Sequence, residues 1–434
     1  MALREQARLR LALFFFRSAL RGHALFGDPA AAVLNRSPNT SPYRLYERVR
    51  ERGELSRSSL GMYTTASHSV VNSILRDHRF GVRTADNNSR ETFQPAGVAR
   101  GQDVHPIQDS FLSLDPPAHT RLRKMAAPWF TPRALRAQTE RIESVVESFL
   151  DELAGRDEFD LIDDFAVRVP IQVICDLLGV PGQEYERFIP WGAILGASLD
   201  DVRTMAEHRR LRGALGEMAE FFDGLIALRR EQPGDDLVSE LVRAGAEDPE
   251  VLHTDLVAST EILLVAGFET TVNLIGNAVL ALLRNPDALA WFIANPDRAD
   301  DLVEEVLRHD PPVQLTMRLA HEPVTIAGVD LRRDDVVLML LAGASRDPSV
   351  FTAPERFDPT RPNNRDHLAF SAGVHYCIGA GLARIEAAVA LRALFLRYPK
   401  LAQAGPERRR HSRNINGMLH LPVRGNTVRR SVLT

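Results

Sequence analysis

The sequence predicts a mainly α-helical protein with small β-sheets, folded as one large domain around a long central helix. Three observations predict this class. Most of the 434 residues fall into helix-like segments separated by short breaks. Strand-like alternation is confined to 60–65 and 324–340, and no linker-like stretch divides the chain. A single core of this size can enclose a bulky ligand.

Composition limits the partners and the compartment. The net charge is -4 at pH 7, with 44% hydrophobic and 25% charged residues, which gives no reason to expect a nucleic-acid partner. The two cysteines, Cys175 and Cys377, are too few for a disulfide framework. We therefore expect a cytoplasmic protein in which Cys175 is a small buried hydrophobe.

The first residues contain an apolar run, 11–16, that ends at Arg17. The run is too short to span a bilayer, and no small-residue cleavage site follows it. We expect a short helix packed on the body of the protein, and loose contact with a membrane surface is the alternative. Further along, Arg83–Gln108 lacks periodicity, which is typical of a lid loop, and Pro233–Asp236 is predicted to be a turn between helices.

The longest helical segment runs from about Thr254 to Arg284 and stops before a proline. Its middle is hydrophobic enough to raise a transmembrane alternative. It contains Glu269, however, and a carboxylate inside a bilayer is costly. No positively charged flank on one side supports spanning. We predict the central helix of a large core and no membrane span.

Cys377 lies on a glycine-bracketed loop, FSAGVHYCIGAGLAR, that leads into a predicted helix. The free N–H groups and the dipole at a helix N-terminus stabilise a thiolate. Glycines on either side let the backbone approach a flat ligand closely. This arrangement suits a thiolate bound to haem iron, where donated electron density favours cleavage of the O–O bond.

The loop resembles the haem loop of cytochromes P450, F-x-x-G-x-H-x-C-x-G. The matching residues are Phe370, Gly373, His375, Cys377 and Gly379. Ser371 stands where glycine is frequent in the family, a minor departure. The resemblance covers about residues 38–425, which leaves 1–37 as an N-terminal extension and 426–434 as a C-terminal tail. It implies the cytochrome P450 fold, haem b as cofactor, and Cys377 as the axial ligand of the iron.

The central helix carries AGFETT, from Ala266 to Thr271. A glycine followed by an acid–alcohol pair is poor helix design, and hydroxyls there can open the helix by bonding its carbonyls. The segment resembles the family pattern A/G-G-x-D/E-T-T/S. The resemblance implies that Ala266 and Gly267 lie over the haem and that Thr270 donates a hydrogen bond to the oxygen being activated. It also implies that Glu269 relays protons inward from solvent.

Two further residue sets follow from the resemblance. Glu305 and Arg308 lie three apart on one helix face and are implied to form a buried structural pair, with Arg356 as the third partner. The haem propionates need cationic or hydrogen-bonding partners. The positions that match the family's propionate partners are His119, Arg123, Arg318 and His375.

The resemblance also implies apolar substrate contacts. These fall at Leu263, Leu264, Phe268, Val313, Leu315, Met418 and Leu419. Their character suits a lipid, terpenoid, steroid or polyketide. The implied reaction is insertion of one oxygen atom from O2. Since the chain lacks iron–sulfur spacing and a flavin-type pattern, we expect electrons from a ferredoxin and its NAD(P)H-dependent reductase. Arg384 near the haem loop is a candidate docking residue for that carrier, and we expect a monomer.

Several alternatives stay open. A peroxygenase or isomerase could share the fold, although relatives that use peroxide typically lack the acid–alcohol pair. A haem-binding sensor or carrier would have little need for Glu269 and Thr270. A thiol-nucleophile enzyme would need a base near Cys377, and His375 is the close candidate.

Overall fold

The computed structural model describes residues 15, 17–37, 40–84, 104–198, 204–410 and 412–425, and the chain is mainly α-helical there. The helices are α2 Pro29–Leu34, α3 Tyr43–Arg50, α4 His68–Arg76, α5 Ala118–Ala126, α6 Pro132–Glu152, α7 Arg168–Leu178, α8 Tyr185–Ser198, α9 Met205–Glu231, α10 Leu237–Glu247, α11 His253–Arg284, α12 Pro286–Ala294, α13 Ala299–His309, α14 Leu341–Ala344 and α15 Ala380–Arg397. The strands are β1 Ser56–Arg57, β2 Tyr63–Thr65, β3 Phe80–Gly81, β4 Glu158–Asp160, β5 Thr316–Ala320, β6 Val324–Ile326, β7 Val329–Leu331, β8 Val336–Met339, β9 Ala402–Gln403, β10 Arg408–Arg409, β11 Met418–His420 and β12 Pro422–Arg424.

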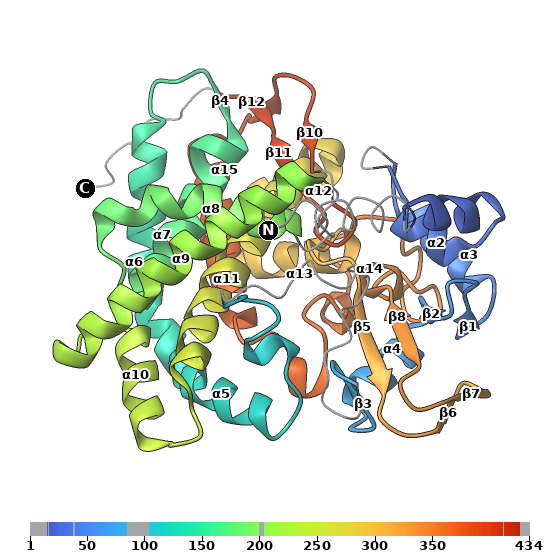
Figure 1. Cartoon of the computed structure of the whole chain (residues 1–434). Coiled ribbons are helices and arrows are strands. Elements are labelled where there is room, and N and C mark those ends of the chain that lie inside the picture. The colour runs from blue at the N-terminus through green and yellow to red at the C-terminus, as the bar shows by residue number, and fades with distance from the viewer. Residues whose placement is uncertain are drawn as a thin grey trace.

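Helix α11 is the centre of the helical region, which fills the left of Figure 1. It contacts α7, α8, α9, α13 and α15. The helix is long and apolar enough to cross a membrane, but 83% of its most apolar window is buried inside the protein. Neighbouring helices therefore cover its apolar surface, as the prediction of a central core helix requires. Its start at His253 lies one residue before the predicted position.

A five-stranded sheet lies on the other side of the molecule, in the order β1-β2-β8-β5-β3. Strands β2 and β8 pair in parallel, and the other pairs are antiparallel. The two strand-like segments of the sequence both contribute, because β2 comes from the first and β8 from the second. Strands β6 and β7 of the second segment pair with each other in a separate two-stranded sheet. Strand β5 was not predicted. Its side chains change from half-buried to buried along its length, so they lack a period of two.

The C-terminal segment forms short strands that the sequence did not reveal. Strand β12 pairs with β4 and β9, and β10 pairs with β11. Strands of two or three residues are too short for an alternating pattern. Their pairing returns the end of the chain to α11, next to the acid–alcohol pair.

Most of the apolar run 11–16 lies outside the described part of the chain, but the residues that follow it form a helix on the body of the protein. Residues 17–25 are helical, and Leu20 is buried with Ala31 and Tyr46 in a small apolar cluster. Leu25 and Phe26 are exposed. Of the lid expected at Arg83–Gln108, residues 85–103 lie outside the described part of the chain.

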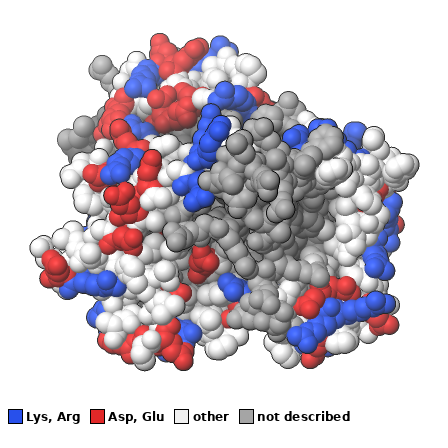
Figure 2. All heavy atoms as spheres, viewed as in Figure 1, with Lys and Arg blue, Asp and Glu red and all other residues white. Residues whose placement is uncertain are grey.

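The turn at Pro233–Asp236 is also confirmed. It joins α9 to α10, where Arg229 Nε lies 2.6 Å from Asp236 Oδ2. On the face drawn in Figure 2, basic and acidic side chains are interspersed rather than separated by sign.

Candidate active site

The Cys377 loop is held by main-chain hydrogen bonds before it enters α15. The Cys377 N–H donates to the Phe370 carbonyl over 2.9 Å, and Gly379 is the N-cap of α15. Cys377 keeps some exposed surface, yet the protein packed around it raises the pKa of its thiol by desolvation. The Gly379 N–H and the charges of Arg123 and Arg384 act in the opposite direction. These groups favour the thiolate, which is the form that binds a metal.

Backbone geometry explains two glycine-type positions of the loop. Gly373 has φ 67°, and a Cβ there would lie 2.1 Å from the Leu75 carbonyl oxygen of α4. No other residue fits that contact. Ser371 also has a positive φ, 63°, so it adopts the conformation that a glycine takes there in the family, at a cost of about 1 kcal/mol. In contrast, a Cβ at Gly379 would meet no protein atom within 4 Å, so protein packing does not require this glycine. An approach by a flat ligand does.

The AGFETT segment is an uninterrupted part of α11 whose side chains bond its own carbonyls. Thr270 Oγ1 donates to the Ala266 carbonyl over 2.9 Å, and Thr271 Oγ1 donates to the Gly267 carbonyl over 3.1 Å. Ala266 is exposed and Thr270 is half-buried, although most of the helix around them is buried. The structure thus places Ala266 and Thr270 on one open side of the central helix.

Glu269 lies in a different environment from the one we expected. It is 3% exposed, and its Oε1 is 2.6 Å from Arg410 Nη1. Burial raises the pKa of Glu269, and Arg410 opposes that shift. The carboxylate therefore faces a buried cation of the C-terminal segment rather than solvent. Nothing in the local sequence distinguishes Arg410 from the arginines beside it, so sequence reasoning missed it.

A polar stripe on α11 binds that C-terminal segment. Asn273 Nδ2 donates to the Glu269 carbonyl over 2.7 Å, and Asn277 Nδ2 donates to the Asn416 carbonyl over 3.2 Å. A Cβ at Gly417 would lie 1.7 Å from Asn273 Oδ1, so the backbone of the C-terminal segment contacts the Asn273 side chain directly and has no room for a side chain there. Residues four apart share a helix face, which explains the polar residues within this apolar helix.

The four expected propionate partners include a close pair of histidines. The rings of His119 and His375 have centroids 4.4 Å apart. Both ring nitrogens of His119, which is 2% exposed, lack a hydrogen-bond partner among the described residues. Burial lowers the pKa of His119 to about 4. Its nearby charges also include Asp115, whose Oδ1 lies 3.8 Å from His375 Nε2.

Two arginines complete this propionate cluster, which we define as His119, Arg123, Arg318 and His375. Arg318 is 5% exposed, and its guanidinium donates to Thr316 Oγ1 and the Met317 carbonyl. Burial lowers its pKa to about 10. Arg123 Nη2 donates to the Tyr376 carbonyl over 2.5 Å, beside the thiolate loop. Buried polar groups normally have partners, so unsatisfied donors beside Cys377 fit the carboxylates of a haem.

The Glu305–Arg308 pair is fully buried, and its bonds are complete. Arg308 Nε and Nη2 donate to the two carboxylate oxygens of Glu305 over 2.7 and 2.8 Å. The Pro354 carbonyl also accepts from Arg308, over 2.8 Å. Arg356 joins only through its carbonyl, 3.0 Å from Arg308 Nη2, because its side chain is 73% exposed. The expectation that the Arg356 guanidinium is the third partner of the pair is therefore wrong. Arg361 takes this place, with its Nε 3.6 Å from Glu305 Oε2. The turn in which the Arg361 N–H donates to the Asp358 carbonyl directs the chain back toward Glu305.

Several expected substrate contacts are packed elsewhere. At about 100° per residue, Leu264 and Phe268 lie about 200° around α11 from Ala266, and the Phe268 ring packs against Gly192 of α8. Leu315 is buried in the N-terminal apolar cluster, and Met418 packs against Gly276.

Of the remaining expected contacts, Leu263 is the one on α11 that lies nearest in angle to the open side. Leu263 lies about 60° from Ala266 around the helix. Val313 and Leu419 are half-buried, and Val313 forms a bridge with Ile415.

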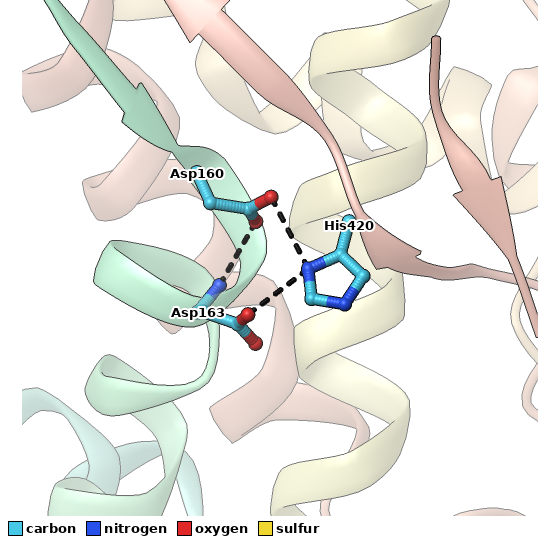
Figure 3. Close-up of side chains that lie close together, drawn as sticks. All are labelled: Asp160, Asp163 and His420. Atoms are coloured by element: carbon cyan, nitrogen blue, oxygen red, sulfur yellow. Dashed lines mark hydrogen bonds and ion pairs between the residues drawn. The ribbon is translucent and has the colours of Figure 1, made fainter.

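A second cluster of potential metal ligands is structural. His420 Nδ1 lies 3.4 Å from Asp160 Oδ2 and 3.0 Å from Asp163 Oδ2 (Figure 3). Its Nε2 accepts from Arg408. Nδ1 must then carry the hydrogen that the carboxylates accept. Both ring nitrogens of His420 are engaged, so the ring offers no free lone pair to a metal, and the group joins β11 to β4 and to the turn before α7.

Comparison with known proteins agrees with this geometry. A family model described as cytochrome P450 matches residues 299–425. The chain is 38% identical over 405 residues to putative cytochrome P450 140 of Mycobacterium tuberculosis, covering 92% of this chain and 91% of that protein. It is 41% identical over 314 residues to 6-deoxyerythronolide B hydroxylase of Saccharopolyspora erythraea, covering 71% and 76%. The structure of P450BioI in complex with hexadec-9Z-enoic acid ligated acyl carrier protein matches with a TM-score of 0.81 and 33% identity, covering 89% and 99%.

Proposed function

The chain belongs to the cytochrome P450 family, and from that premise we propose that it inserts one oxygen atom from O2 into an apolar small molecule. Its electrons would come from a separate ferredoxin and an NAD(P)H-dependent reductase. One observation carries the proposal: Thr270 lies at the open side of the central helix beside exposed Ala266, and the buried carboxylic acid Glu269 precedes it directly in the chain. An enzyme that activates O2 needs proton donors at that place.

Haem b held by the Cys377 thiolate would supply the reductive activation of dioxygen. The residues of the propionate cluster would hold the two carboxylates of the haem through charge-assisted hydrogen bonds. Phe370 and Gly379 would line the thiolate side, and Ala266 and Gly267 the opposite side. The Gly379 N–H would stay directed at the sulfur, which limits the negative charge that the thiolate donates.

Proton supply in this proposal depends on two bonds that must be released. Thr270 Oγ1 is bound to the Ala266 carbonyl and would turn to donate to the oxygen being activated. The Glu269 carboxylate is bound to Arg410 and would leave it to carry a proton from outside the pocket. Arg410 is thus a positioning residue. Replacing it with Gln removes the cation that opposes the raised pKa of Glu269, so the pH profile of coupled turnover should move to higher pH.

The alternatives differ in what they ask of these residues. A peroxygenase or isomerase has no need for an acid–alcohol pair that delivers protons, and a sensor or carrier has no need for it either. A thiol-nucleophile enzyme needs a base at the sulfur. His375 has its Nε2 directed toward Asp115 and its ring against His119, which favours a role in holding the haem.

The proposed substrate class rests on the apolar character of the residues expected to contact it. Leu263, Ala266, Val313 and Leu419 are uncharged, and a lipid, terpenoid, steroid or polyketide would fit them. One relative is named for hydroxylation of 6-deoxyerythronolide B, and another was crystallised with a fatty acid on a carrier protein. Both are large and mainly apolar, which supports the class without selecting a member.

A cytoplasmic location belongs to the same proposal, with weak peripheral contact to lipid at the N-terminus. Exposed Leu25 and Phe26 support the contact. Co-sedimentation with anionic vesicles tests it: the double variant Leu25→Ser, Phe26→Ser should lose binding. Equal binding by wild type and variant would contradict the contact.

The test of the main proposal has two stages. The reduced protein with carbon monoxide should show the thiolate-type absorption band, and an imidazole-type band in fresh protein would overturn the assignment. Once a substrate has been found by spectral shifts, Thr270→Ala should keep haem and substrate binding but divert O2 into hydrogen peroxide. Thr271→Ala is the matched control, because Thr271 is buried and makes the same kind of bond to a carbonyl. Native coupling in Thr270→Ala would contradict the proton-delivery role.

A further inference from the structure

A second buried charged group lies behind the thiolate loop, centred on Glu304 of α13. Glu304 is 1% exposed. Its Oε2 is 3.0 Å from His367 Nε2, and its Oε1 accepts from Arg384 Nε over 2.5 Å. Glu304 therefore joins α13 to the segment before the loop and to α15 after it.

The charges of this group can be assigned from its hydrogen bonds. The Ala369 N–H donates to His367 Nδ1 over 3.2 Å, so Nδ1 is an acceptor and the hydrogen lies on Nε2. Burial lowers the pKa of His367, in agreement with a neutral ring. The buried part of the group therefore contains one negative charge, on Glu304, and one positive charge, on Arg384. A third guanidinium, that of Arg365, lies 3.9 Å from Glu304 Oε1, but its side chain is 62% exposed, so solvent screens its charge.

Arg384 lies against the thiolate loop itself. Its Cζ is 4.5 Å from the centroid of the Phe370 ring, and Nη1 donates to the Tyr376 hydroxyl over 3.2 Å. The Phe370 carbonyl accepts the N–H of Cys377. Arg384 thus contacts the residue that anchors Cys377 and the residue that precedes it. Its side chain is 26% exposed, so its main contacts are internal, in contrast to the docking role considered from the sequence.

We propose that the Glu304–Arg384 pair sets the charge balance behind Cys377 and thereby the reduction potential of the bound haem. The inference rests on the haem-thiolate assignment. A positive charge near the iron favours the reduced state, and a negative charge favours the oxidised state. The paired charges cancel in the native protein, so loss of either charge leaves the other uncompensated in a partly buried place, where screening by salt is weak.

The experiment is a charge-removal cycle read by spectroelectrochemistry of the haem-loaded protein. Glu304→Gln leaves Arg384 uncompensated and should raise the reduction potential. Arg384→Gln leaves Glu304 uncompensated and should lower it. The double variant removes both charges and should return toward the native potential.

Two further variants separate charge from packing. Arg384→Lys keeps the charge and should keep the potential close to native, even if haem is held less tightly. Arg397→Gln is the matched control on α15: Arg397 pairs with Asp151 over 2.7 Å, and it lies about 20 Å along the helix from Arg384. Its loss should leave the potential unchanged.

A purely structural role would move both single variants in the same direction or leave both unchanged, and either result overturns the inference. A shift in Arg384→Lys equal to that in Arg384→Gln overturns it as well. If Glu304→Gln does not fold, the two Arg384 variants still decide. Absence of the thiolate-type band in the wild-type protein would instead refute the haem-thiolate assignment itself.

Discussion

Two buried groups of charged side chains lie near Cys377, and they differ in whether the protein satisfies them. The Glu305–Arg308 pair has partners for the arginine's Nε, Nη1 and Nη2, including main-chain carbonyls of the segment before the haem loop. In the propionate cluster, both nitrogens of His119 lack a partner among the described residues. Because an unpaired buried polar group is unfavourable, the first group stabilises the fold and the second is prepared for a ligand.

The largest effect should come from removing the Cys377 thiolate. A haem whose carboxylates are bound by the propionate cluster would need this thiolate as the ligand of its iron. Cys377→Ala should abolish the thiolate-type band of the reduced carbonmonoxy protein, because alanine offers no ligand to iron. Absorption spectra of the purified protein measure this. Cys175→Ala is the control: Cys175 is buried in α7, so its loss should leave the band intact. A thiolate-type band in Cys377→Ala would refute the assignment.

Breaking the satisfied group should cost stability. Arg308→Met removes both hydrogen bonds that the buried Glu305 carboxylate accepts from Arg308 and leaves only Arg361, 3.6 Å away, as a cation beside it. The free energy of unfolding should therefore fall by about 3–5 kcal/mol. Urea unfolding of the haem-free protein measures it. Arg356→Ala, which removes an exposed guanidinium, should change it by no more than about 0.5 kcal/mol. Similar losses in both variants would place the stabilising contact elsewhere.

An arginine-to-methionine substitution in the propionate cluster should instead weaken haem binding and leave the stability of the haem-free protein nearly unchanged. Arg318→Met removes a buried cation that bonds only its own strand. The haem-free protein should therefore change in stability by less than about 1 kcal/mol. Haem affinity should fall about 10-fold to 100-fold, since a charge-assisted hydrogen bond is lost. Titration with haem measures this. Unchanged affinity together with a large loss of stability would show that Arg318 is structural.

The smallest effect should be on how the free energy of unfolding depends on pH. The residue responsible is Glu304, which directly precedes Glu305 in the chain. Hydrogen bonds from His367 and Arg384 outweigh burial and lower the pKa of Glu304 to about 2, from its ordinary 4.5. A lowered carboxyl pKa contributes stability above 4.5 that is lost as the pH falls toward about 2. Glu304→Gln should remove that part of the pH dependence of unfolding. An unchanged profile in the variant would contradict it.

Local sequence patterns identified the parts of the fold that obey a long period. Helix α11 begins within one residue of the predicted position, because its apolar pattern continues over many turns. The family resemblance led to Leu264 and Phe268 as expected substrate contacts, but helix geometry turns both away from the open side of α11. Both are apolar, but they lie on the far side of α11 from Ala266. Hydrophobicity alone does not state which side of a buried helix faces a ligand.

The sequence by itself determined the family: a cysteine between glycines before a helix, and an acid–alcohol pair within an apolar helix, carry the resemblance from which the chemistry is proposed. Only the tertiary structure decided the partners of those groups. Arg410 reaches Glu269 from far along the chain, Arg361 replaces Arg356 beside Glu305, and Arg384 turns inward to Glu304. Arginines are numerous in this sequence and look alike locally. Burial and distance select the ones that matter, and both arise only when distant segments pack together.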